Sequence, residues 1–279
     1  HSIQQCNRIS IQRLAVTLTA LILLAAVLAL MLAIDLGVFH REPRALTTRE
    51  ALVWSLVWVG TSLVFNAFIY FAYDRHWLDL GQDLSGEQAA VQFFTAYVVE
   101  KSLSVDNIFV IAMIFGSLAV PAMYQHRVLF WGILGAIAMR GVMIVVGARL
   151  IAEFHWLLTV FAGFLIFTGV KMLFAKEEHS DPAASGPVRL LRRWLPISER
   201  FHGQRFLAPR SAEPGIRSFF VLTPLALALI LVEGADLVFA VDSIQAVFAI
   251  TGDPFLVFTS NVFAILGLRS LYFALAGMV

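Results

Sequence analysis

Two apolar stretches of the chain each contain a pair of acidic residues six positions apart, and a small polar residue follows the second acid of each pair. A further acid lies about one helical turn before the second pair. Carboxylate and amide oxygens are hard ligands, which suit magnesium, calcium or manganese. Histidine and cysteine are absent from both stretches, which argues against zinc, copper or iron–sulfur chemistry. We therefore take six side chains as candidate ligands of a metal ion: Glu100, Asp106, Asn107, Glu233, Asp236 and Asp242.

Other polar side chains in the apolar stretches are candidates to support or to oppose such a site. They are Asn66, Lys101, Arg140, Ser243, Asn261 and Arg269. The two asparagines could supply further oxygens, whereas the three bases could pair with the acids as buried salt bridges. Five candidate acids against three bases leave acids over, which pairing alone does not explain. A role in handling ions or protons and a purely structural pairing both stay open.

Helical spacing predicts which of these side chains share a face. At about 100° per residue, Glu100 and Asn107 lie about 20° apart, and Asp236 and Ser243 have the same relation. The second acid of each pair points about 120° away from the first. One straight helix therefore cannot aim all its acids at one ion. Either the helix unwinds there, with Gly234 as a hinge in the second stretch, or the second acid serves another partner.

The composition indicates the elements that carry these residues. Of the 279 residues, 59% are hydrophobic and 14% are charged, against about 45–50% and about 25% in soluble domains. So apolar a chain must expose much of its surface to lipid. The net charge of +1 and the lack of a basic-aromatic motif argue against binding of nucleic acid. Cys6 is the single cysteine, so no internal disulfide or thiolate cluster can form.

We predict an all-α fold, a polytopic transmembrane helical bundle. A crossing helix needs about 20 apolar residues. Spans are expected near Leu14–Phe39, Ala51–Ala72, Phe93–Gly116, Val128–Ala152, Phe154–Ala175, Phe219–Ile250 and Phe255–Val279. The first apolar run is longer than the core of a cleaved signal peptide, so we expect a retained helix.

Loops rich in positive charge alternate along the chain with loops that lack it. This alternation predicts the orientation of the protein in the membrane. The long loop Lys176–Arg217 is rich in arginine and proline. We expect this loop in the cytoplasm and the N-terminus outside. Its composition is typical of a linker, with at best one short helix near Val188–Leu195.

The two acidic stretches also belong to an apparent internal repeat. Ile133-Leu-Gly135 leads to Arg140 in the first half, and Ile265-Leu-Gly267 leads to Arg269 in the second. Units of three helices would run in opposite directions, and transporters built from inverted three-helix repeats bind substrate where the repeats meet. The expected division is an N-terminal two-helix segment (1–92), a first repeat (93–175), the cytoplasmic linker (176–217) and a second, truncated repeat (218–279).

Three polar motifs together resemble those of the TerC family of integral membrane proteins. They are Glu100-Lys-Ser-Leu-Ser-Val-Asp-Asn-Ile-Phe, Val232-Glu-Gly-Ala-Asp-Leu-Val-Phe-Ala-Val-Asp-Ser-Ile and Ser260-Asn-Val-Phe-Ala-Ile-Leu-Gly-Leu-Arg-Ser-Leu-Tyr-Phe. The likeness extends to Trp54-Ser-Leu-Val-Trp and Phe167-Thr-Gly-Val-Lys-Met-Leu, and covers nearly the whole chain outside the long loop. One departure is Gln245, where the family usually has proline.

The resemblance implies a bacterial inner-membrane protein of the wider LysE-type transporter group. Family members are linked to manganese export, and the name comes from tellurium resistance. Carried over by motif, the six candidate ligands above are the ion-handling residues. The absence of that proline weakens the expectation of a kink just beyond Asp242.

The leading hypothesis is therefore a non-enzymatic exporter of a divalent metal cation, manganese first, with protons exchanged through the same carboxylates. Its partners would be the lipid bilayer, the metal ion and protons, with no tightly bound cofactor and no protein partner indicated. A second hypothesis is a non-transporting membrane factor in envelope stress, tellurium resistance or membrane-protein insertion. A third is an aspartyl protease using Asp106 and Asp242. Its usual Gly-x-Gly-Asp motif is absent, because Asp236 follows Glu-Gly-Ala.

Overall fold

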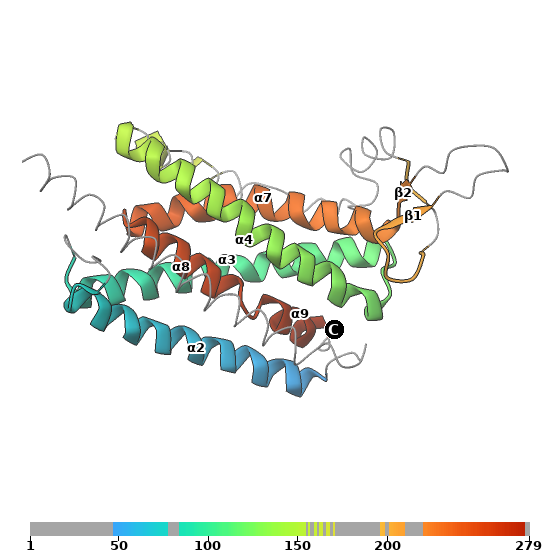
Figure 1. The fold of residues 1–279 in the computed structure, drawn as a ribbon, viewed down its shortest axis with the longest axis horizontal. Helices are drawn as coiled ribbons and strands as arrows, with labels where there is room; N and C mark the ends of the chain where they lie inside the picture. The colour runs from blue at the N-terminus through green and yellow to red at the C-terminus, as the bar shows by residue number, and fades with distance from the viewer. Residues whose placement is uncertain are drawn as a thin grey trace, which may run out of the picture. The chain divides into compact units, whose positions relative to one another are not determined.

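The computed structural model describes residues 47–77, 84–154, scattered residues between 156 and 170, and residues 196–198, 201–209 and 220–276. Its elements are α2 (Thr48–Asp74), α3 (Gly86–Ser117), α4 (Ala122–Glu153), β1 (Leu207–Pro209), β2 (Phe220–Leu222), α7 (Pro224–Ile250), α8 (Pro254–Ile265) and α9 (Leu268–Ala276) (Figure 1). The predicted helical membrane bundle is confirmed. The expected span Leu14–Phe39 and the expected short helix Val188–Leu195 lie outside the described residues, and the span Phe154–Ala175 is described only in part.

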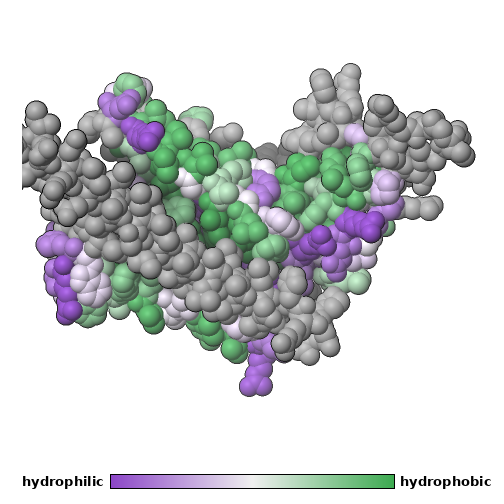
Figure 2. Space-filling view, in the orientation of Figure 1, coloured by the Kyte–Doolittle hydropathy of each residue, from purple (hydrophilic) through white to green (hydrophobic). Residues whose placement is uncertain are grey.

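Among the described residues, four stretches are long and apolar enough to cross a membrane: Thr48–Asp74, Ala122–Ile151, Pro224–Ile250 and Pro254–Leu275. The remaining long helix, α3, has 32 residues, which at about 1.5 Å per residue exceed the hydrocarbon thickness of about 30 Å. Its middle carries the charged motif. In Figure 2 the described helices present mostly hydrophobic surface, with hydrophilic residues mainly near helix ends. Val64 and Val142 are 72% and 65% exposed among the described residues, as expected of side chains that face lipid.

Prolines and capping side chains set where the later helices begin. Pro224 and Pro254 occupy the first turn of α7 and α8, where the missing N–H would have no intrahelical partner. Thr223 accepts a hydrogen bond from the backbone N–H of Ala226, and Asp253 accepts one from that of Phe255 at 2.8 Å. These side-chain oxygens satisfy amide groups that the first turn leaves unpaired.

The described residues fall into two compact units. One contains Thr61–Phe94, and the other contains Ala45–Gly60 together with the described residues from Thr95 onward. Within the second unit, α4 packs against α7, α8 and α9, and α7 packs against α8. All the residues of the site described below belong to this second unit.

Two apolar clusters of described residues lie inside the second unit. One contains Ile108 and Phe115 of α3, Leu129 of α4, Val232 of α7 and Tyr272 of α9. The other contains Ala96, Ile144, Ala240, Phe248 and Val257. Along α3 the chain passes from the second cluster, at Ala96, to the first, at Ile108. Along α7 it passes from the first cluster, at Val232, to the second, at Ala240. The two motif-bearing helices therefore run in opposite directions, as an inverted repeat requires.

Two expectations from the sequence need correction, and one of two open alternatives is excluded. The span expected at Phe219–Ile250 begins later, because Phe220–Leu222 forms β2 and pairs antiparallel with β1, with Ala208 opposite Val221. This places a strand inside the linker, where only a short helix was expected. The helix does not unwind at the acidic motifs, since α3 and α7 are helical throughout. The interruption lies in the last span, at Gly267, whose φ is 81°.

Candidate functional site

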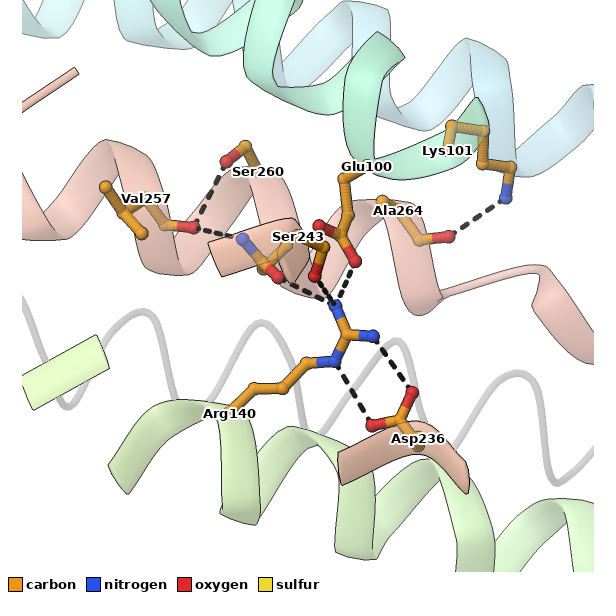
Figure 3. A network of polar contacts seen from close by, with 9 residues as sticks. Glu100, Lys101, Arg140, Asp236, Ser243, Val257, Ser260 and Ala264 are labelled. Atoms are coloured by element: carbon orange, nitrogen blue, oxygen red, sulfur yellow. Dashed lines mark hydrogen bonds and ion pairs between the residues drawn. The ribbon is translucent and has the colours of Figure 1, made fainter. Parts of the chain in front are cut away.

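The guanidinium of Arg140 is the centre of a buried polar cluster. Its Nη1 contacts Glu100 of α3 and donates to Asn261 Oδ1 of α8 at 2.9 Å and to Ser243 Oγ of α7 at 3.4 Å. Its Nη2 and Nε donate to the two carboxylate oxygens of Asp236 at 2.9 and 3.2 Å. Figure 3 shows the guanidinium between the side chains of Glu100, Ser243 and Asp236. With Asn261, its partners come from three other helices. Arg140 lies on α4, so the cluster joins four helices.

The Arg140 cluster holds two carboxylates against one guanidinium. Arg140 and Glu100 are 2% and 1% exposed, and Asp236 is 17% exposed. A two-pronged contact between guanidinium and carboxylate is among the stronger charge-assisted hydrogen bonds. Removal of one partner of a buried ion pair typically destabilises a protein by about 3–5 kcal/mol. If both acids are ionised, the cluster keeps one uncompensated negative charge.

The amide of Asn261 is oriented by its own helix. Its Nδ2 donates to the carbonyl of Val257 one turn earlier at 3.1 Å, which leaves Oδ1 turned towards Arg140. The Ser260 hydroxyl donates to the same carbonyl at 3.1 Å. Asn261 thus acts as a fixed oxygen ligand for the guanidinium.

A small cavity of about 30 Å³ adjoins the Arg140 cluster, which is room for one or two water molecules or one ion. Its polar lining consists of Ser104, Asn107, Arg140 and Asp236. Ser104 Oγ, Asn107 Oδ1 and Glu100 Oε2 are buried with no hydrogen-bond partner among the described residues. Each such oxygen costs about 1–3 kcal/mol when it stays unpaired. These three residues follow the i, i+4, i+7 spacing of one helix face, so α3 presents a row of acceptors.

The six predicted ligands do not all converge. Glu100, Asn107 and Asp236 are at the Arg140 cluster or its cavity. Asp106 is exposed, and Asp242 is half-buried, because they occupy other faces of α3 and α7. Among the described residues, no group of three or more histidine, cysteine or acidic side chains is placed to hold a metal.

Glu233 is half-buried one turn before Asp236 on α7. Its carboxylate lies against Gly135 of α4, where an added Cβ would overlap it. No hydrogen bond or ion pair joins Glu233 to another side chain in the part of the chain that the structure describes. The glycine therefore makes room for an acid beside the Arg140 cluster.

Lys101 caps the interruption of the last span. Its Nζ donates to the carbonyl oxygen of Ala264 at 3.0 Å (Figure 3) and to that of Leu266 at 3.3 Å. These carbonyls lose their helical partners where α8 ends, and a cation there also complements the helix dipole. The interpretation of Lys101 as a salt-bridge partner of a buried acid is therefore wrong for the described residues. Irregular backbone at membrane depth is tolerated only where protein satisfies it, and Lys101 does so here.

Two further predicted residues lie on other helices. Arg269 is 2% exposed on α9, two positions beyond Gly267. Asn66 is half-buried on α2, in the other compact unit. Sequence reasoning missed Ser104, although its position one turn after Glu100 is a usable signal. It also treated Arg140 as a supporting residue, whereas the structure makes it the centre.

Comparison with known proteins agrees with the motifs. The model of the integral membrane protein TerC family matches residues 85–279. A Myxococcus xanthus protein called "Uncharacterized membrane protein STKORF319" is 50% identical over 249 residues, which cover 89% of this chain and 72% of that one. An Escherichia coli K12 protein called "Putative membrane-bound redox modulator Alx" is 47% identical over 256 residues, 91% of this chain and 76% of its own. No solved structure matches the chain. The chain therefore belongs to the TerC family of integral membrane proteins.

Proposed function

We propose that this protein transports a divalent metal cation, manganese first, across the bacterial inner membrane. The observation that carries the proposal is a set of three buried oxygens, of Glu100, Ser104 and Asn107, that have no hydrogen-bond partner among the described residues. They lie at the Arg140 cluster and at the small, mostly apolar cavity beside it, which Asp236 also lines. Burial of that many acceptors is unfavourable unless something positive or hydrogen-bonding occupies the space. A cation that passes between the helices would supply that partner.

The chemistry of the donors favours a hard cation. Carboxylate, amide and hydroxyl oxygens suit manganese, magnesium or calcium, and the cavity lining contains no sulfur or imidazole. Manganese and the outward direction come from the family resemblance. The proposal includes proton exchange through the same carboxylates and excludes an enzymatic activity. In the proposed orientation, the arginine-rich loop Lys176–Arg217 lies in the cytoplasm and the N-terminus lies outside.

The test is manganese flux in proteoliposomes, with and without a pH gradient. Glu100→Gln and Asp236→Asn should each abolish flux, because each removes a charged oxygen from the cavity region. The control is Glu87→Gln, the same type of change at an exposed position in the first turn of the same helix, and it should retain flux. Magnesium and calcium as competitors measure selectivity.

Wild-type flux from both cavity variants would contradict the proposed site. No flux from well-folded wild type would instead favour the non-transporting membrane factor. Arg140 already neutralises part of the acidic charge, so a structural cluster is the physical basis of that alternative.

A further inference from the structure

The oxygens around Arg140 are those that a hard divalent cation would choose. The guanidinium takes two carboxylates, one amide oxygen and one hydroxyl, from Glu100, Asp236, Asn261 and Ser243. Metal ions of this class prefer the same mixture of charged and neutral oxygens. Arg140 therefore occupies the position in which the acids of both motif-bearing helices meet.

A metal ion and the guanidinium cannot share these acids at low cost. A divalent ion beside an undisplaced Arg140 would place three positive charges against the two carboxylates, in a region where solvent screens poorly. In place of Arg140, the same ion would neutralise Glu100 and Asp236 fully. The unpaired oxygens of Ser104 and Asn107 in the adjoining cavity would then complete its coordination. The electrostatics make the two cations alternatives.

A further acid, Glu233, lies beside Asp236, a present partner of Arg140. Glu233 lies one turn before Asp236 on α7, about 4.5 Å along the axis at 1.5 Å per residue. Its carboxylate rests against Gly135, on the same helix as Arg140. The cavity is lined by Gly132 and Ala136 of α4, small residues that leave space on the N-terminal side of Arg140, the direction in which helical side chains lean.

We propose that Arg140 is a tethered cation that competes with the transported metal for Glu100 and Asp236, and that Glu233 receives its guanidinium when the metal binds. This inference rests on the proposed function and adds to it the regulation of the same site. With no metal bound, Arg140 neutralises one of the two negative charges of Glu100 and Asp236, and this lets the empty carrier change conformation. With metal bound, the guanidinium pairs with Glu233.

The test measures Mn²⁺ binding to the whole purified chain in nanodiscs, by the electron paramagnetic resonance signal of free Mn²⁺. Arg140→Gln removes the competitor, so its Kd for Mn²⁺ should fall at least about tenfold. Arg140→Lys keeps a tethered charge and should stay close to wild type. Glu233→Gln removes the second partner of Arg140, so the Kd should rise at least about tenfold. Glu87→Gln is the matched control and should bind as wild type does.

Flux measurements separate the two steps of the cycle. Arg140→Gln should keep the exchange of Mn²⁺ for Mn²⁺ across the membrane and lose net efflux, because the empty carrier then holds two bare carboxylates. If wild type binds Mn²⁺ but folded Arg140→Gln binds it no better, Arg140 is not a competitor and the inference fails, while the proposed function stands.

If neither wild type nor Arg140→Gln binds Mn²⁺, both the inference and the proposed function fail. Should Arg140→Gln not fold, Glu233→Gln decides. It leaves the Arg140 cluster intact, and an unchanged Kd would overturn the inference.

Discussion

The two copies of the repeated sequence pattern are built differently. In the first copy, Ile133-Leu-Gly135 lies inside the uninterrupted helix α4, and the glycine accommodates the Glu233 carboxylate. In the second copy, Ile265-Leu-Gly267 interrupts the span between α8 and α9, and the glycine backbone approaches Trp58. A helix can stop within a membrane only where other groups satisfy its carbonyls. At the second copy, the Lys101 ammonium group donates hydrogen bonds to these carbonyls. The repeated sequence thus determines which helix faces are polar. Whether the helix is interrupted depends on the side chains that pack against it.

The largest expected effect is a difference in stability between alanine substitutions at Gly267 and at Gly135. Gly267→Ala introduces a Cβ at φ 81° and 2.8 Å from the Trp58 side chain. The left-handed conformation and the overpacking together should destabilise the protein by about 2–4 kcal/mol. Gly135→Ala meets only the flexible end of Glu233 and gains helix propensity, so it should change stability by less than about 1 kcal/mol. Thermal unfolding in detergent measures both, and equal losses would show that the two copies are equivalent after all.

The second-largest loss of stability is expected for Lys101→Met. It leaves two carbonyls at the end of α8 without their charged donor, which should cost about 1.5–3 kcal/mol. Hydrogen exchange of α8 and α9 amides should accelerate while α4 stays protected. Ser102→Ala, which removes an exposed side-chain bond to Val98, is the control. Unchanged exchange in α8 would mean that Lys101 does not hold the interruption.

The first and second acids of each pair should differ in metal binding. Glu100→Gln changes the Arg140 cluster and should weaken Mn²⁺ binding at least about tenfold, or about 1.4 kcal/mol. Asp106→Asn changes an exposed residue on another face and should alter binding less than about threefold. The motif alone treats both acids alike, so equal losses would favour the motif over the geometry.

The smallest effect is expected from a substitution at Ser104 that makes the first copy of the repeat resemble the second. Ser104 corresponds to Ala240, since each lies four residues after the first acid of its pair. Ser104→Ala removes a buried hydroxyl that has no partner among the described residues. Stability should therefore rise or stay within about 1 kcal/mol, while Mn²⁺ binding weakens. A clear loss of stability by thermal unfolding would reveal a partner for this hydroxyl.

The sequence predicts the helices and their polar faces, but not which residues meet across them. Composition and periodicity suffice for the membrane bundle and for the shared face of Glu100 and Asn107. The contacts of Arg140 join residues 40, 96 and 121 positions apart, and no local pattern encodes such pairing. Asp106 and Asp242 match the motif equally well, and only the rotation of each helix in the bundle separates them from Glu100 and Asp236.

The Lys101 contact also bears on how the protein is made. Lys101 precedes the Ala264 carbonyl by 163 residues, and chains are synthesised and inserted from the N-terminus. When the ribosome reaches the last span, α3 has already been synthesised and can supply its ammonium group. Without it, the broken span would leave the buried carbonyls of Ala264 and Leu266 without their charged donor. Biogenesis of the span Pro254–Leu275 is therefore conditional on the earlier insertion of α3, which gives these two elements a fixed order of assembly.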